Sequence, residues 1–161
     1  MLFERQKPML SDLIKPEAVI PLINATSKKH LLQELASNIS IVYDIKQSDV
    51  FSALQEREIL GATGMGYGVA IPHAKLKSIT DVRGLFLKLE KPIDFESIDH
   101  QHVDLVFALI APQDSTTNHL KALAKVSRLL RRTDICTKLR STTNRAAIFS
   151  ILTNNDEIQA A

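Results

Sequence analysis

Long apolar runs are missing from this 161-residue sequence. Its longest apolar stretches, such as residues 103–112, are much shorter than the roughly 20 residues that a membrane-spanning helix needs. Residues 1–8 contain neither an apolar core of secretory length nor a small-residue cleavage site. We therefore expect a cytoplasmic protein with no direct membrane insertion.

Cysteine is scarce, and neither sign of charge is in clear excess. Cys136 is the only cysteine, so an internal disulfide is impossible, as suits a reducing compartment. The 20 lysines and arginines are spread along the chain beside 18 acidic residues, for a formal net charge of +2. Proteins that bind nucleic acid usually carry a basic stripe, so we expect no nucleic-acid partner.

The chain also has no internal repeat and no linker rich in proline, glycine or serine. Apolar residues make up 45% and charged residues 24% of the sequence, which is close to the averages of soluble globular domains. The length suits one hydrophobic core. We expect a single domain over residues 1–161, with frayed ends at residues 1–10 and 154–161.

Apolar residues that recur at helical spacing predict a series of helices. Serine, threonine, aspartate and asparagine precede these stretches and can accept hydrogen bonds from the free amides of a first turn. Gly61 is a stop signal for the second of them. The predicted helices span about 27–42, run from Ser48 to near Leu60, begin at Thr117 for about four turns, and begin at Thr133 and at Asn144.

Three segments are predicted to be extended. Residues 82–89 alternate in apolar character, and residues 103–110 form a nearly unbroken apolar run, which is typical of a strand buried on both faces. Residues 69–72 form a short extended run with His73 at its end, because Pro72 disfavours helical geometry before it. Strands interleaved with helices predict one α/β domain, a central mixed β-sheet with helices packed on both faces.

The segment 61–68 carries four of the five glycines of the chain and is predicted to be a loop. Exposed amides of such a loop can bind phosphate, but a nucleotide-binding motif does not fit. Gly66 and Gly68 are followed by Tyr67 and Val69, where a P-loop ends in Gly-Lys-Ser or Gly-Lys-Thr. The loop also precedes a strand, whereas a dinucleotide fingerprint precedes a helix.

Two histidines are candidates for chemistry. His73 follows a glycine-rich loop and Pro72, and a neutral imidazole suits reversible phosphoryl transfer near pH 7, although a lone histidine at a strand end is usually structural. His119 lies in the first turn of a predicted helix, where the positive end of the dipole lowers its proton affinity and attracts phosphate. The alternative for His119 is a capping or packing role.

Other polar residues have simpler interpretations. His100 and His102 would share one face of a strand and could chelate a metal, but no cysteine or glutamate completes a set, so a solvated loop is favoured. His30 is expected on a helix surface, and Arg57 beside Glu58 suggests an exposed ion pair. We predict no metal site and no cofactor.

Residues 57–64 (Arg-Glu-Ile-Leu-Gly-Ala-Thr-Gly) and 68–73 (Gly-Val-Ala-Ile-Pro-His) together resemble the fructose/mannitol-type enzyme IIA domain of the bacterial phosphotransferase system. The similarity continues through 91–95, 103–110 and His119-Leu120, so it covers nearly the whole chain. We expect no transporter or carrier domain to be fused to this chain. It is therefore most similar to the nitrogen-regulatory branch of that family.

The resemblance implies a phosphotransferase component that carries a phosphohistidine. A histidine phosphocarrier protein would phosphorylate His73 at Nε2, and the chain would pass the group on or signal by its phosphorylation state in nitrogen- or potassium-linked regulation. Arg57 and His119 match the residues that the family keeps beside that histidine. The acceptor would be a regulatory target or a permease component. The loop residues expected to complete the phosphate site are Gly61, Thr63, Gly64, Gly66 and Gly68.

Three alternatives remain open from the sequence. The chain could serve a fructose- or mannitol-type sugar uptake system, or it could be a regulatory protein-binding module whose interactions are switched at His73. A weaker alternative is an anion- or metal-binding module built on the glycine loop and the pair His100 and His102.

Overall fold

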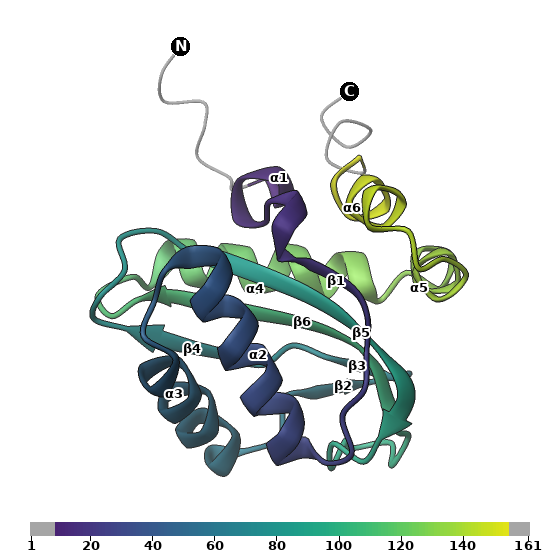
Figure 1. Cartoon of the computed structure of the whole chain (residues 1–161), viewed down its shortest axis with the longest axis horizontal. Helices are drawn as coiled ribbons and strands as arrows, with labels where there is room; N and C mark the ends of the chain where they lie inside the picture. Colours follow the sequence, from purple (N-terminus) through teal and green to yellow (C-terminus); the bar gives the residue numbers. More distant parts are fainter. Residues whose placement is uncertain (1–8, 155–161) are drawn as a thin grey trace.

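The computed structural model describes residues 9–154 (Figure 1). Of the ends expected to fray, 1–10 and 154–161, residues 1–8 and 155–161 lie outside the described residues. Leu10 begins a helix and is buried, so ordered structure already includes this residue, which we expected to belong to the frayed end. Asn154 forms the C-cap of the last helix.

Helices and strands both occur in the described part of the chain, as predicted, but five strands follow one another with no helix between them. In chain order the elements are α1 (Leu10–Leu13), the 3₁₀ helix η2 (Pro16–Ala18), β1 (Val19–Ile23), α2 (Lys28–Tyr43), α3 (Gln47–Leu60), β2 (Gly64–Gly66), β3 (Val69–Ala70), β4 (His73–Leu76), β5 (Arg83–Ile93), β6 (Val103–Pro112), α4 (Thr117–Leu130), α5 (Thr133–Arg140) and α6 (Arg145–Thr153).

The strands form one mixed sheet. Its order is β1-β5-β6-β3-β2, with β4 also paired to β6. β5 is antiparallel to β6 and β2 to β3, whereas β1 is parallel to β5, and β3 and β4 are parallel to β6. The predicted mixed sheet is therefore confirmed, with β6 at its centre and almost every β6 residue buried.

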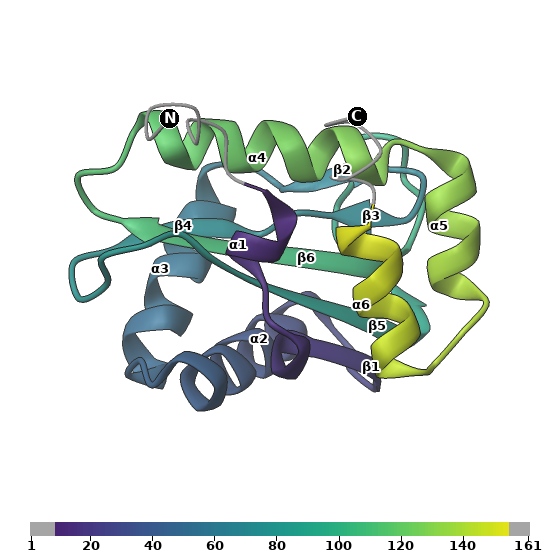
Figure 2. The ribbon, with the colours of Figure 1, turned by 90° about the horizontal axis from the view of Figure 1, so that it is seen from above.

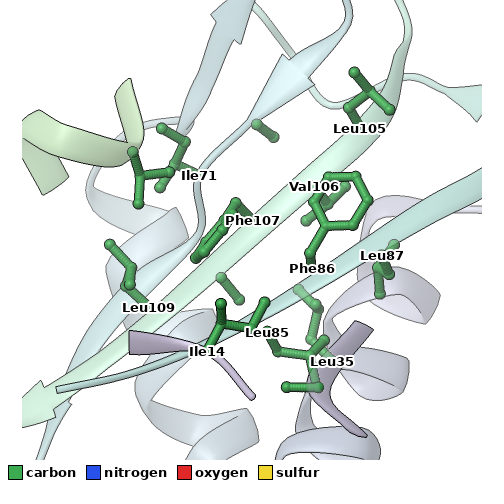
Figure 3. Close-up of a cluster of buried hydrophobic side chains, with 14 of the residues drawn as sticks. Ile14, Leu35, Ile71, Leu85, Phe86, Leu87, Leu105, Val106, Phe107 and Leu109 are labelled. Carbon is green, nitrogen blue, oxygen red and sulfur yellow. The ribbon is translucent and has the colours of Figure 1, made fainter. Parts of the chain in front are cut away.

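Helices cover both faces of this sheet, as the sequence predicts. Figure 2 shows α2 and α3 on one side and α4 on the other. α5 contacts α4, α6 contacts α5, and α6 in turn contacts β1. The core lies mainly around β5 and β6, where Phe86 faces Phe107 across the two strands with ring centroids 6.4 Å apart (Figure 3).

The two long helices before the glycine-rich segment begin in different ways. Ser27 caps α2, because its hydroxyl accepts a hydrogen bond from the amide of His30 at 3.1 Å. The expected start of the second helix at Ser48 is wrong by one residue. The carbonyl of Lys46 accepts from the amides of Asp49 and Val50, so α3 already begins at Gln47.

The prediction of a loop over the whole of 61–68 is wrong in part. Residues Gly64–Gly66 form β2, which pairs with β3 through a turn at Tyr67 and Gly68, both with positive φ. Glycine-rich strands carry no side-chain alternation, so periodicity does not reveal them. β1 was also missed. It contains Pro21, which the outermost strand of a sheet tolerates.

His73 begins a strand, whereas the sequence placed it at the end of one. β3 and β4 both run parallel to β6, and the two residues between them, Ile71 and Pro72, interrupt the ladder. Pro72 has no N–H to donate, although its carbonyl still accepts from the amide of Leu109 at 2.9 Å. The interruption presents His73 at the sheet edge beside α3.

Candidate functional site

The His73 side chain is held by its own backbone. Its Nδ1 atom lies 2.8 Å from the carbonyl oxygen of Ile71, two residues before it. A carbonyl can only accept, so Nδ1 carries the hydrogen and donates it. In the neutral ring the lone pair therefore resides on Nε2.

His73 is partly buried, and this sets its protonation state. Burial lowers the pKa of His73 below its ordinary value, and the Arg57 cation lowers it further. The Ile71 carbonyl and the Glu58 carboxylate act in the opposite direction, but the pKa stays lowered. His73 is therefore mainly neutral and nucleophilic at pH 7.

His119 meets His73 edge to face, with ring centroids 5.6 Å apart and an interplanar angle of 66°. It lies in the first turn of α4, as predicted, and is 7% exposed. Burial lowers the pKa of His119 to about 4, with His73 and Lys75 contributing. The sequence attributed a lowered proton affinity to the helix dipole, but burial is the largest cause. Within residues 9–154, Nδ1 of His119 has no hydrogen-bond partner.

Arg57 comes from the last turn of α3, where its Nη1 donates to the carbonyl of Gly61 at 2.8 Å. Arg57 and Glu58 are neighbours in the sequence, but within residues 9–154 they do not form the ion pair that we expected. Arg57 instead lines a hollow of about 420 Å³ together with His73 and His119. The residues lining this hollow are Ala53, Glu56, Arg57, Leu60, His73, Ala74, Lys75, Gln113 and His119.

The structure does not bring the glycine-rich segment into this hollow. None of Gly61, Thr63, Gly64, Gly66 and Gly68 is among the lining residues. A Cβ atom on Gly66 would lie 3.1 Å from the Asp99 carboxylate.

The register of the sheet shows how far the glycine-rich segment lies from His73. Val69 pairs with Leu105 and His73 pairs with Leu109, so Gly68 precedes His73 by more than about 13 Å of strand. A Cβ atom on Gly68 would lie 2.6 Å from Nη2 of Arg140. Of the five residues, Gly61 is bound to Arg57, whose Nη1 donates to its carbonyl.

Sequence reasoning missed several residues near the site. Lys75 and Gln113 line the hollow, and alternation along β4 places Lys75 on the same side as His73. This signal is readable only once β4 is known to begin at His73. The sequence paired Glu58 with Arg57, but the structure pairs it with Lys28 at 2.8 Å, and Glu58 also accepts from the amide of Thr63.

The remaining histidines lie apart from this hollow. His100 and His102 are in the exposed loop between β5 and β6, so the loop interpretation is confirmed. His30 stays near the surface of α2, where it pairs with Glu34 at 3.4 Å. Over residues 9–154 there is no group of three or more His, Cys, Asp or Glu side chains that could hold a metal ion.

A sequence model of one protein family matches residues 12–155, and its description is "Phosphoenolpyruvate-dependent sugar phosphotransferase system, EIIA 2". The chain belongs to this enzyme IIA family. It is 50% identical over 143 residues to the nitrogen regulatory protein of Bradyrhizobium diazoefficiens, covering 89% of this chain and 94% of that protein. The resemblance seen in the sequence is thus confirmed.

Solved structures of the enzyme IIA family share the fold. The nitrogen regulatory protein IIA-Ntr of Neisseria meningitidis superposes with a TM-score of 0.84 at 29% identity, covering 89% of this chain and 99% of that one. The mannitol enzyme IIA of Escherichia coli, solved in complex with phosphorylated enzyme IIB, gives a TM-score of 0.75 at 17% identity and covers 88% of this chain and 99% of that one.

These findings establish the chain as a component of the phosphotransferase system, with relatives named for nitrogen regulation. No helix in the described part of the chain has the length and apolar character to cross a membrane.

Proposed function

We propose that the chain is a phosphocarrier that accepts a phosphoryl group on Nε2 of His73 from a histidine phosphocarrier protein. It then signals in nitrogen-linked regulation by its phosphorylation state. The observation that carries the proposal is the hydrogen bond from Nδ1 of His73 to the Ile71 carbonyl. This bond leaves Nε2 as the nucleophile beside a hollow that Arg57 and His119 also line.

The transfer step follows from this geometry. The Nε2 lone pair forms a bond to phosphorus, and the bond between phosphorus and the donor's nitrogen breaks, with its electron pair returning to the donor imidazole. The proton on Nδ1 stays in place, and the Ile71 carbonyl stabilises the positive charge that the His73 ring gains. Catalysis is then mainly positioning and electrostatic stabilisation.

Arg57 and His119 stabilise the phosphoryl group in different ways. The group carries about two negative charges, and the planar guanidinium of Arg57 is oriented for it by the Gly61 carbonyl. His119 is neutral at pH 7 because its pKa is about 4. A neutral ring can donate one N–H to a phosphoryl oxygen without the cost of burying a second cation.

Exposed apolar side chains around the hollow support a protein as the phosphoryl donor. Ile59 is 78%, Leu60 83% and Leu120 64% exposed. Leu60 itself lines the hollow, Ile59 precedes it, and Leu120 follows His119 in α4. Apolar residues gathered around a reactive group are typical of a protein-docking surface.

Phosphorylation with isolated components tests the proposal. The chain is incubated with phosphoenolpyruvate, enzyme I and the histidine phosphocarrier protein, and the product is mapped by mass spectrometry. We expect one acid-labile phosphoryl group on His73, no label on His73→Ala and full label on His100→Ala, which changes an exposed loop histidine. Full labelling of His73→Ala, or label on another residue, contradicts the proposal.

The output can be tested by recovering partners from cell extract. A regulatory partner that recognises the unphosphorylated surface is expected to bind wild type and His73→Ala alike, and to lose a His73→Asp variant that carries a negative charge. Recovery of a sugar permease component would instead favour the sugar-uptake role.

A further inference from the structure

Glu58 is a buried carboxylate that does not line the His73 hollow. Its side chain is 5% exposed and comes from the last turn of α3, next to Arg57. The amide of Thr63 donates to both carboxylate oxygens at 3.2 Å, and the Thr63 hydroxyl donates to the same carboxylate. Lys28, at the start of α2, completes the set with an ion pair at 2.8 Å.

Thr63 joins this carboxylate to the reactive histidine. Its own carbonyl accepts from the amide of Ile71 at 3.0 Å. The Ile71 carbonyl, on the other side of the same residue, accepts from Nδ1 of His73 at 2.8 Å. A continuous set of hydrogen bonds therefore runs from Glu58 through Thr63 and Ile71 to the imidazole.

The interruption of the sheet at Ile71 and Pro72 explains why these hydrogen bonds are needed. Ile71 and Pro72 lie between β3 and β4 and have no register partner in β6, although the Pro72 carbonyl still accepts from the Leu109 amide. Ile71 must then be oriented by other contacts, and its amide is held by Thr63. Whatever fixes Thr63 also fixes the carbonyl that selects the His73 tautomer.

Charge balance explains why a lysine accompanies the carboxylate. A phosphoryl group on His73 would bring about two negative charges near Glu58, and an unpaired carboxylate would repel it. Lys28 pairs with Glu58 from the side of α2 at 2.8 Å, closer than its second contact, 3.3 Å to the exposed Glu96 carboxylate, and its ammonium lies 4.7 Å from the centre of the Phe95 ring. Glu58 can thus accept hydrogen bonds without opposing the phosphoryl group.

We propose that Glu58, held by Lys28, is a positioning residue that fixes Thr63 and the Ile71 carbonyl, and thereby keeps the proton of His73 on Nδ1. The functional role of this positioning rests on the proposed phosphorylation of His73. The tautomer itself can be measured without any phosphoryl donor.

The first test is nitrogen NMR of histidine-labelled protein at pH 8, where His73 is neutral. Wild type is expected to show one protonated and one unprotonated ring nitrogen for His73, with Nδ1 protonated. In Glu58→Gln an NH2 group replaces one carboxylate oxygen, so Thr63 has one acceptor fewer and Lys28 has no opposite charge to pair with. The two ring-nitrogen signals of His73 should then move toward a tautomeric average. The phosphorylation rate should fall about 10- to 100-fold, because reacting groups are misplaced.

Matched variants separate this effect from loss of charge or of stability. Glu90→Gln removes an exposed carboxylate from β5 and should change neither the NMR signals nor the rate. Thr63→Val removes the hydroxyl and should act like Glu58→Gln, whereas Thr63→Ser keeps it and should behave as wild type. Circular dichroism checks folding, and the Thr63 pair decides the matter if Glu58→Gln does not fold.

The outcomes distinguish this inference from the proposed function. Wild-type tautomer signals in folded Glu58→Gln and Thr63→Val, or a wild-type His73 protonated on Nε2, overturn the positioning role. If these variants shift the tautomer but wild type takes up no phosphoryl group, the positioning role stands and the proposed function fails.

Discussion

Two histidines meet at the centre of the site, and both are kept neutral mainly by burial. The pKa of His73 is lowered while a backbone carbonyl holds Nδ1, so one nitrogen remains available for bond formation. The pKa of His119 falls to about 4, and its ring packs edge to face against His73. A pair of charged imidazoles at this distance would repel each other, so neutrality is a condition of the arrangement.

The lowered pKa of His119 makes stability depend on pH. Between pH 6.5 and 4 the unfolded chain binds a proton at His119 that the native protein does not bind. The stabilisation is therefore full above pH 6.5 and is lost as the pH falls, by about 3 kcal/mol at pH 4. Urea unfolding from pH 4 to 7.5 should show a shallower loss for His119→Gln than for wild type.

NMR titration provides the direct check on His119. Its ring signals should change near pH 4, well below the ordinary histidine pKa of about 6.5. An inflection of the His119 signals near pH 6.5, or equal pH dependence of stability in wild type and His119→Gln, would contradict the burial argument.

At the scale of elements, the hairpin of β2 and β3 is held by contacts with α5 and with the segment around Asp99 and Asp104. Arg140 from α5 donates to the Tyr67 carbonyl at 2.9 Å and to the Asp104 carboxylate at 2.8 Å. Asp99 accepts from the Tyr67 amide at 2.8 Å. These contacts tie the hairpin to α5 and to the loop before β6, away from the hollow at His73.

Replacing Gly68 tests whether the hairpin is structural or binds phosphate. Gly68 has a φ of +79°, and a Cβ atom would lie 2.6 Å from Nη2 of Arg140 and 3.1 Å from Asp104. Gly68→Ala should lower the free energy of unfolding by about 1–3 kcal/mol in urea. The phosphorylation rate of the folded variant should stay within about twofold of wild type, because Gly68 does not line the hollow.

The matched control is Ser78→Ala at an exposed position, which should leave both measurements unchanged. A large loss of phosphorylation in folded Gly68→Ala would instead favour the earlier expectation that the loop amides bind phosphate.

At the scale of the whole molecule, the site exists only where three elements converge. Arg57 comes from the end of α3, His73 from the start of β4 and His119 from the start of α4. α3 covers one face of the sheet and α4 the other (Figure 2), so the hollow lies at a sheet edge open to both. An edge position suits transfer between proteins, because a partner can approach the nitrogen directly.

The exposed apolar residues around this hollow give a test of docking. Leu60→Asp should raise the KM for the phosphorylated donor protein about tenfold or more, with a small change in kcat, because a charge replaces an apolar contact. Ile41→Asp is the matched control, since Ile41 is 77% exposed, lies near the C-terminal end of α2 and does not line the hollow. Equal KM values for the two variants would show that Leu60 takes no part in docking.

Local patterns predicted much of the fold because their signals lie within a few residues. The apolar spacing of α2 and the continuous apolar run of β6 marked these elements to within a few residues. The short strands β2 and β4 were not recognisable, because glycines and a proline interruption leave no alternation to read.

The sequence by itself determined the α/β class and, through the motif that ends at His73, the residue proposed to react, because both depend on neighbours along the chain. The family motif also predicted Arg57 and His119 beside that histidine, but only the tertiary structure decided how they reach it and which other residues line the hollow. Arg57 and His119 meet it through packing of α3 and α4 on opposite faces, while Gly64, Gly66 and Gly68 turn away along the strand register. Such contacts depend on how distant segments pair and pack, and one-dimensional spacing does not contain that information.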